Sequence, residues 1–291
     1  MTGSVTRRAV RSDLFAVHKL LNPALNRVPL PGRQRGFLPV WGCEEPYGYL
    51  VEDAGEVVGF LGTLNTRREV RGKLESFCEI HSWYVKDEYR NQSMNLLLPV
   101  IAQKRTKTII NFTPTPPVYA MGAKLGFKDL ETSFVAFYPW PIQPGPVKIV
   151  TDPWQVPGFL KGEDLRIFHD HKDIGCNHIV MLPQDDPAGV PLYAIIKTLH
   201  RRWFEPFGRL IYVNDRPRFA NLLGRICWRL CAKFKWVAMV ANSDDFRELK
   251  PRIYSQVSRR EVSSQFISTR LEPSDINQLY SQPLLMGYPL H

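Results

Sequence analysis

The stretch that decides the fold runs from Cys78 to Gln103 and reads CEIHSWYVKDEYRNQSMNLLLPVIAQ. It begins with an apolar, β-rich run, continues through a polar turn at 86–92, and ends in a helical run at 93–103. Another apolar run follows at 108–112. Strand, turn, helix and strand in this order predict a βαβ unit. The backbone N–H groups at the start of its helix would form an anion site.

Two motifs in this region resemble those of the GNAT superfamily of N-acyltransferases. Residues 85–95 resemble the family's acyl-CoA motif, in which an Arg or Gln opens a loop, Arg/Gln-x-x-Gly-x-Gly/Ala, that grips the CoA pyrophosphate. Lys124-Leu125-Gly126-Phe127 resembles the ending of its last core helix. The resemblance covers residues 5–140 and implies a mixed α/β fold (α+β class), with a central twisted mixed sheet flanked by helices.

The resemblance also implies that acetyl-CoA or another acyl-CoA is the donor substrate. It assigns the donor contacts to eight residues: Tyr84, Val85, Arg90, Asn91, Gln92, Ser93, Met94 and Asn95. Backbone N–H groups near the first two of these would polarise the thioester carbonyl.

Acyl transfer to an amine requires that the amine lose a proton, which a carboxylate or a histidine can accept. Alternation along the strand predicts that Glu79, His81 and Trp83 share one face. Glu79 resembles the catalytic Glu of some GNAT enzymes, although its pKa would have to be raised for this role. His81 needs no such shift. Both are candidate bases, and an interior structural role for both is the alternative.

Three residues depart from the family pattern. Ser93 and Asn95 replace small residues of the pyrophosphate loop, and Gly122 stands where the family often has a general-acid Tyr. Tyr119, one helical turn earlier, is a candidate acid or only a packing residue. These departures leave a non-catalytic module that binds an anionic ligand as an alternative.

The irregular segment 22–42 is long enough to suggest a functional loop. The family places a substrate-contacting loop here, and an ordinary surface loop is the alternative. The predicted acceptor contacts are Arg33, Arg35, Phe37, Trp41 and Trp83.

Periodicity and turn residues predict the other elements of the first half. They are a strand at 5–10, a helix from residue 12, a hairpin of strands 48–53 and 56–64, a polar turn at 67–73, a helix at 118–125 and a closing strand at 134–138.

A proline-rich stretch at 141–148 predicts a linker between two domains, 1–140 and 149–291. The second half repeats the βαβ outline, with strands predicted at 209–213 and 236–240 around a helix at 219–234. This repeat predicts two GNAT-like domains in tandem, the second degenerate and shaping the acceptor site. Some other α+β domain is the alternative.

Composition bounds the class of protein. The chain has 291 residues, 44% of them hydrophobic, and no apolar run approaches the roughly 20 residues of a spanning helix. We therefore predict a cytoplasmic protein without a membrane span, whose five scattered cysteines are reduced. The net charge of +10 indicates an anionic partner such as CoA, and nucleic acid is a weaker candidate.

One region is dense in metal-ligating side chains but matches no zinc pattern. We predict no metal there, and expect a solvated loop or one that lines the acceptor site. The residues are His169, Asp170, His171, Asp173, Cys176 and His178.

Together these features predict an acyl-CoA-dependent N-acyltransferase, in the first instance an acetyltransferase. The predicted acceptor is a small primary amine, for which we expect an amino sugar or a nucleotide-linked amino sugar. The alternatives are the non-catalytic module and an acyl or aminoacyl transferase acting on a large carrier such as tRNA. The oligomeric state stays open.

Overall fold

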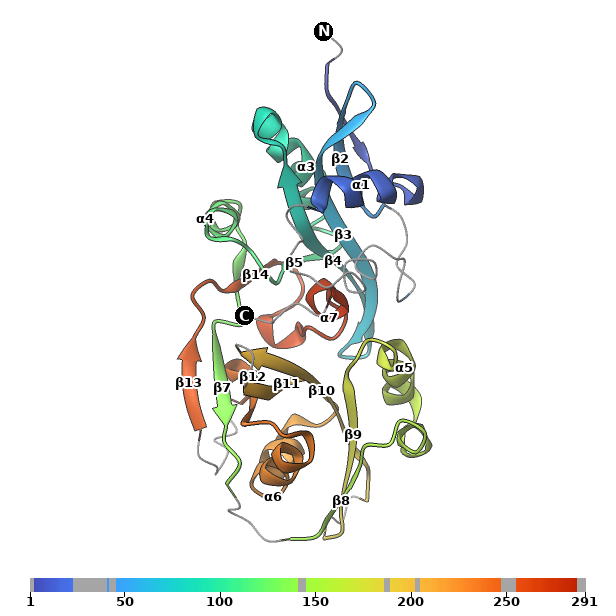
Figure 1. The fold of residues 1–291 in the computed structure, drawn as a ribbon, viewed down its shortest axis with the longest axis vertical. Helices are drawn as coiled ribbons and strands as arrows, with labels where there is room; N and C mark the ends of the chain where they lie inside the picture. Colours follow the sequence, from blue (N-terminus) through green and yellow to red (C-terminus); the bar gives the residue numbers. More distant parts are fainter. Residues whose placement is uncertain are drawn as a thin grey trace.

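The described residues of the structure, a computed structural model, form two mixed sheets of seven strands each. Figure 1 shows the sheets one above the other, with the C-terminal part of the chain between them. The described residues are 3–22, 41, 46–140, 145–185, 189–201, 205–246 and 255–286.

The first sheet has the order β1-β2-β3-β4-β5-β14-β6. Among the described strands of this sheet, only β4 and β5 pair in parallel, and the other neighbours pair antiparallel. The strands are β1 (Val5–Arg8), β2 (Gly48–Asp53), β3 (Glu56–Val70), β4 (Lys73–Val85), β5 (Thr108–Asn111), β6 (Lys128–Leu130) and β14 (Ser264–Ile267). Its helical segments are η1 (Arg11–Asp13), α1 (Leu14–Leu21), η2 (Asp87–Gln92), α3 (Ser93–Ile101) and α4 (Pro116–Lys124).

The second sheet has the order β13-β7-β12-β11-β10-β9-β8, with β11 and β12 parallel. Its strands are β7 (Ser133–Phe137), β8 (Val147–Val150), β9 (Asn177–Pro183), β10 (Leu192–Arg201), β11 (Glu205–Val213), β12 (Ala238–Asn242) and β13 (Ser255–Arg259). The remaining helical segments are η3 (Val156–Phe159), α5 (Gly162–His171), α6 (Arg216–Phe234), η4 (Ser243–Phe246), η5 (Pro273–Asp275) and α7 (Gln282–Met286).

Both predicted βαβ units are confirmed. In the first, α3 connects the parallel strands β4 and β5, and in the second, α6 connects β11 and β12. The mixed α/β class and the tandem arrangement predicted from this repeat are therefore present.

The strand predicted at 134–138 does not close the first sheet, and this prediction is wrong. It is β7, and it pairs with β12 and β13 of the second sheet. The first sheet is completed instead by β14, which lies between β5 and β6 and fills the edge that β7 would need. Thus β7, which precedes the predicted linker, belongs to the second sheet, and β14, which follows it, belongs to the first. Residues 141–144 lie outside the described part. The boundary at 141–148 stays a prediction.

The polar turn predicted at 67–73 is also wrong in extent. Strands β3 and β4 continue to the pair Val70↔Lys73, and only Arg71 and Gly72 form the turn. Both have positive φ, 52° and 75°, as a two-residue hairpin turn requires. The polar residues misled the prediction because one of them, Arg68, is buried under the C-terminal segment, with 7% of its surface exposed.

The C-terminal helix α7 connects the two halves by packing. Leu284 and Leu285 are buried in a cluster with Ile167 and Tyr193 of the second half. Met286 is buried in a cluster of the first half, against α1 and β3. Burial of these side chains on both sides stabilises the arrangement of the sheets around α7.

Candidate active site

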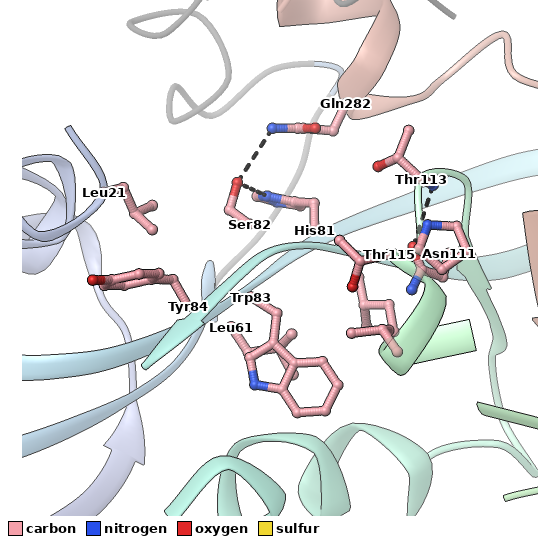
Figure 2. A pocket seen from close by; sticks show the side chains of 13 residues that line it. Leu21, Leu61, His81, Ser82, Trp83, Tyr84, Asn111, Thr113, Thr115 and Gln282 are labelled. Carbon is pink, nitrogen blue, oxygen red and sulfur yellow. Dashed lines mark hydrogen bonds between the residues drawn. The ribbon is translucent and has the colours of Figure 1, made fainter. Parts of the chain in front are cut away.

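A cleft opens where the two parallel strands of the first sheet separate. Strands β4 and β5 pair from Phe77↔Thr108 to Glu79↔Ile110 and then diverge. A cavity of about 270 Å³ lies beyond this point. Residues 80–84 of β4 form one wall, Asn111 and the loop after β5 form the other, and Gln282 of α7 covers it (Figure 2).

A β-bulge shapes the β4 wall. The register passes from Gly62↔His81 to Phe60↔Tyr84, so two residues of β4 oppose one residue of β3. Ser82, within the bulge, has φ +49°. The extra residue reverses the alternation of side chains. Trp83 therefore points to the face opposite His81 and Ser82, as Figure 2 shows, and the prediction that it shares a face with Glu79 and His81 is wrong.

His81 lines the cavity and is half-buried. Its imidazole packs directly on Gly62, where an added Cβ would lie 2.2 Å from a ring carbon. Its Nδ1 lies 3.1 Å from the Ser82 hydroxyl oxygen. Burial lowers the pKa of His81 to about 4, so the ring is neutral at pH 7.

Glu79 is only 2% exposed and is not among the residues that line the cavity. Its Oε2 accepts a hydrogen bond of 2.9 Å from the backbone N–H of Gln282. Burial raises the pKa of Glu79 to about 8, against the opposing effects of this hydrogen bond and of the Arg68 charge. The carboxyl group thus contacts the C-terminal segment, and the cavity lies one residue farther along β4.

Arg68 fixes the same C-terminal segment. Its guanidinium donates to the backbone oxygens of Asn277 at 3.0 Å and Tyr280 at 2.8 Å. It also lies 4.5 Å from the centroid of the Phe77 ring. Together with the bond from Gln282 to Glu79, these contacts hold the Gln282 side chain at the cavity, where its Nε2 lies 3.5 Å from the Ser82 oxygen.

The backbone at the outer end of β4 presents a donor to the cleft. The Lys86 N–H donates to the Val58 oxygen of β3 at 2.9 Å. Because amides along a strand alternate between its two edges, the Val85 N–H points away from β3 and toward the cleft. This is one of the two positions expected to polarise a thioester carbonyl.

The predicted pyrophosphate loop is the helix η2 and the first turn of α3. Arg90 is exposed, and its guanidinium lies 2.7 Å from Asp87. The Asn95 amide donates to Gln92 at 2.6 Å, and the Gln92 side chain makes no capping bond to the first turn of α3. Of the remaining predicted contacts in this loop, Asn91 is exposed, Ser93 begins α3, and Met94 packs against the core below. Of the eight predicted donor contacts, Tyr84 lines the cavity.

Tyr119 lies outside the cavity lining. Its hydroxyl donates to Asp129 at 2.8 Å on the surface. At Gly122 an added Cβ would lie 2.4 Å from the side-chain oxygen of Gln265, a buried residue of β14. The inserted strand thus occupies the space that the family's Tyr would need.

Of the residues predicted to contact the acceptor, Arg33, Arg35 and Phe37 lie outside the described part of the chain. The Trp41 indole donates to the backbone oxygen of Asp170 at 2.8 Å and stacks on His171 at 5.2 Å between centroids. Trp41 therefore packs on the second half, away from the cavity lining.

The region dense in metal-ligating residues is largely used for packing. Both ring nitrogens of His171 face backbone oxygens, and His178 Nδ1 lies 2.6 Å from the Tyr193 hydroxyl. Asp170 accepts a hydrogen bond of 2.7 Å from Tyr280. Within the described residues, no group of three or more His, Cys, Asp or Glu is placed to hold a metal ion.

Sequence reasoning missed a second cleft and part of the first. Strands β11 and β12 pair from Phe207↔Ala238 to Arg209↔Val240, and a cavity of about 390 Å³ lies beyond this point. Arg209 thus holds the place that Glu79 has in the first cleft. Gln282 was also missed, because nothing in its local sequence indicates that it reaches a strand some 200 positions earlier.

Comparisons with known proteins agree with this geometry. No family model and no curated protein matches the sequence. Among solved structures, the chain is similar to a GCN5-related N-acetyltransferase from Anabaena variabilis (14% identity, 91% of this chain and 72% of that one, TM-score 0.58). It is similar to another from Kribbella flavida (11%, 91% and 71%, TM-score 0.55).

A third similar structure is a GCN5-related glucosamine N-acetyltransferase region of a fungal multi-domain β-N-acetylglucosaminidase (13%, 91% and 38%, TM-score 0.56). The chain therefore adopts the fold of the GCN5-related N-acetyltransferases. Among the helices of the described residues, none combines the length and the apolar character needed to cross a membrane.

Proposed function

We propose that the protein is an N-acyltransferase that moves an acetyl or other acyl group from acyl-CoA to the primary amine of a small acceptor. The observation that carries this proposal is the cleft between β4 and β5, which holds a cavity at the β-bulge of Ser82. The GCN5-related fold supports an acyl-CoA donor at this place.

The donor lies along the outer half of β4 in this proposal. The pyrophosphate binds near Arg90 and the first turn of α3, where N–H groups at a helix start attract an anion. The Val85 N–H donates to the thioester oxygen and stabilises the negative charge that develops there.

His81 is the proposed base, because it lines the cavity and is neutral at pH 7. The amine nitrogen attacks the thioester carbon, a C–N bond forms and the C–S bond breaks. The amine proton passes to His81, and the CoA thiolate leaves and takes a proton from solvent or from the imidazolium. Glu79, although its pKa is better matched to neutral pH, contacts Gln282 and is absent from the lining. Position takes priority over pKa in this choice.

The lining favours a neutral, hydroxyl-rich acceptor. With His81 neutral, the described lining residues carry no charged side chain at pH 7, and six of them offer hydroxyl or amide groups: Ser82, Tyr84, Asn111, Thr113, Thr115 and Gln282. Such groups suit the hydroxyls of an amino sugar, and a glucosamine N-acetyltransferase region shares the fold. A polyanionic carrier such as tRNA would be expected to need basic residues here.

The test measures acetyl transfer from acetyl-CoA to a panel of amines. The release of the free CoA thiol is the signal that is monitored. The panel contains glucosamine, a nucleotide-linked amino sugar, an aliphatic diamine and an aminoacylated tRNA. The proposal expects turnover with an amino sugar. Acetyl-CoA binding without turnover on any amine would favour the non-catalytic module, and turnover on the tRNA alone would favour the large-carrier alternative.

A further inference from the structure

A second, much smaller cavity adjoins the cleft. It has a volume of about 10 Å³, room for about one water-sized group. It shares Ile80, Trp83, Asn111 and Val118 with the main cavity, and its own lining adds the apolar side chains of Leu97, Met121 and Phe127. The two cavities therefore lie against each other, and the smaller one forms an apolar end beside the cleft.

Trp83 lines both cavities, on the side where they adjoin. The bulge at Ser82 turns the indole away from His81 and toward the helical side, as Figure 2 shows. There it packs against the cluster that contains Ile80, Leu97 and Phe127. Without the bulge the alternation of β4 would place this side chain on the face of His81, so the bulge is what puts it at the apolar end.

The apolar end is closed by rigid groups. Gly122 lies against Gln265, with space for no further carbon atom between them. Gln265 is 1% exposed, and its amide donates to the Tyr119 backbone oxygen at 3.2 Å. Gln265 cannot move away without losing this bond. Among the side chains that line both cavities, Trp83 is the largest, so its truncation would enlarge the apolar end most.

We propose that Trp83 sets the length of the acyl group, limiting the cleft to acetyl and propanoyl groups. This inference rests on the proposed function. The acyl end of the donor lies at the point where β4 and β5 meet, and the small apolar space beyond holds about one further group. A longer chain meets the indole and gains no apolar burial.

The test compares the affinities of CoA, acetyl-CoA, butanoyl-CoA and hexanoyl-CoA by titration calorimetry. The variants are Trp83→Ala, Trp83→Leu as a milder change, and Trp154→Ala as a matched control, because Trp154 is 92% exposed. Binding is the readout, so no acceptor is needed.

In the unaltered protein and in Trp154→Ala, affinity should not rise from acetyl-CoA to hexanoyl-CoA. In Trp83→Ala it should rise by about tenfold for every two methylenes buried, with a smaller rise in Trp83→Leu. A rise in the unaltered protein, or equal profiles in all the folded variants, would overturn the role of Trp83. Failure of CoA and every acyl-CoA to bind would instead remove the proposed function.

Discussion

The two clefts of this molecule have the same strand topology but differ at the helix that follows. In each, parallel pairing ends at the third residue pair, at Glu79↔Ile110 and at Arg209↔Val240. In the second, the Asp215 carboxylate accepts the Arg218 N–H at 3.0 Å and caps α6. In the first, Gln92 makes no such bond to α3. Because a carboxylate already occupies the α6 start, a phosphate is expected only at the first cleft.

The two clefts also differ in the last residue of β4 and of β11 that takes part in parallel pairing. Glu79 and Arg209 are both buried, 2% and 3% exposed, and carry opposite charges. Glu79 holds the C-terminal segment through Gln282, whereas the Arg209 guanidinium lies 4.2 Å from the Phe134 ring centroid. The repeated fold thus does not repeat the chemistry, and the following variants test that difference.

The largest expected effect concerns His81 against Glu79. His81→Gln should lower kcat about 10²–10⁴-fold with little change in acyl-CoA affinity, as removal of a general base does. Glu79→Gln should leave most of the rate. The titration of His81 should also cause no change in kcat between pH 5 and 8, because its pKa lies at about 4. An increase in kcat with pH near pH 8 that is absent from Glu79→Gln would show that Glu79 is the base instead.

The second effect is on stability. The Glu79 pKa is raised from 4.5 to about 8, so this group contributes most to stability below pH 4.5 and its contribution is lost as pH rises toward 8. At about 1.4 kcal/mol per pKa unit, the loss is of the order of a few kcal/mol. Glu79→Gln has no carboxyl group to titrate, so it does not lose this stability. The difference in Tm between the variant and the unaltered protein should therefore increase in favour of the variant from pH 5 to pH 8. A constant difference in Tm would show that the carboxyl group does not titrate in this range.

The third effect compares an arginine near each helix start. Arg90→Ala should weaken acetyl-CoA binding about 10- to 100-fold, corresponding to roughly 1.5–3 kcal/mol for a hydrogen bond to a charged group. Arg216→Ala, at the start of α6, should leave the affinity unchanged. Titration calorimetry on both variants measures the affinity for acetyl-CoA. Equal losses of affinity would contradict the claim that only the first cleft binds the CoA phosphates.

The smallest effect concerns the α6 cap. Asp215→Ala should lower the free energy of unfolding by about 1 kcal/mol, the usual cost of losing an N-cap. It should leave acetyl-CoA affinity at the first cleft unchanged. Denaturant unfolding measures the first quantity, and an unchanged free energy would show that Asp215 is not a stabilising cap.

The sequence predicted both βαβ units because their strands and helices are marked by local periodicity and turn residues. It could not predict the bulge at Ser82, since a serine with positive φ has no local signature, and Trp83 was therefore placed on the wrong face. Nor could it predict that β14 inserts beside β5, because this pairing joins residues some 150 positions apart. The burial of Glu79 under Gln282 and the stacking of Trp41 on His171 follow from the same kind of distant contact.

The central claim is that acyl-CoA binds at the first cleft and not at the second. A crystal structure of the protein with acetyl-CoA tests this most directly. The account predicts one CoA per chain, with its thioester beside residues 80–84 and its pyrophosphate at η2 and α3. CoA density at residues 210–217, or density at neither cleft with saturating ligand, would contradict it.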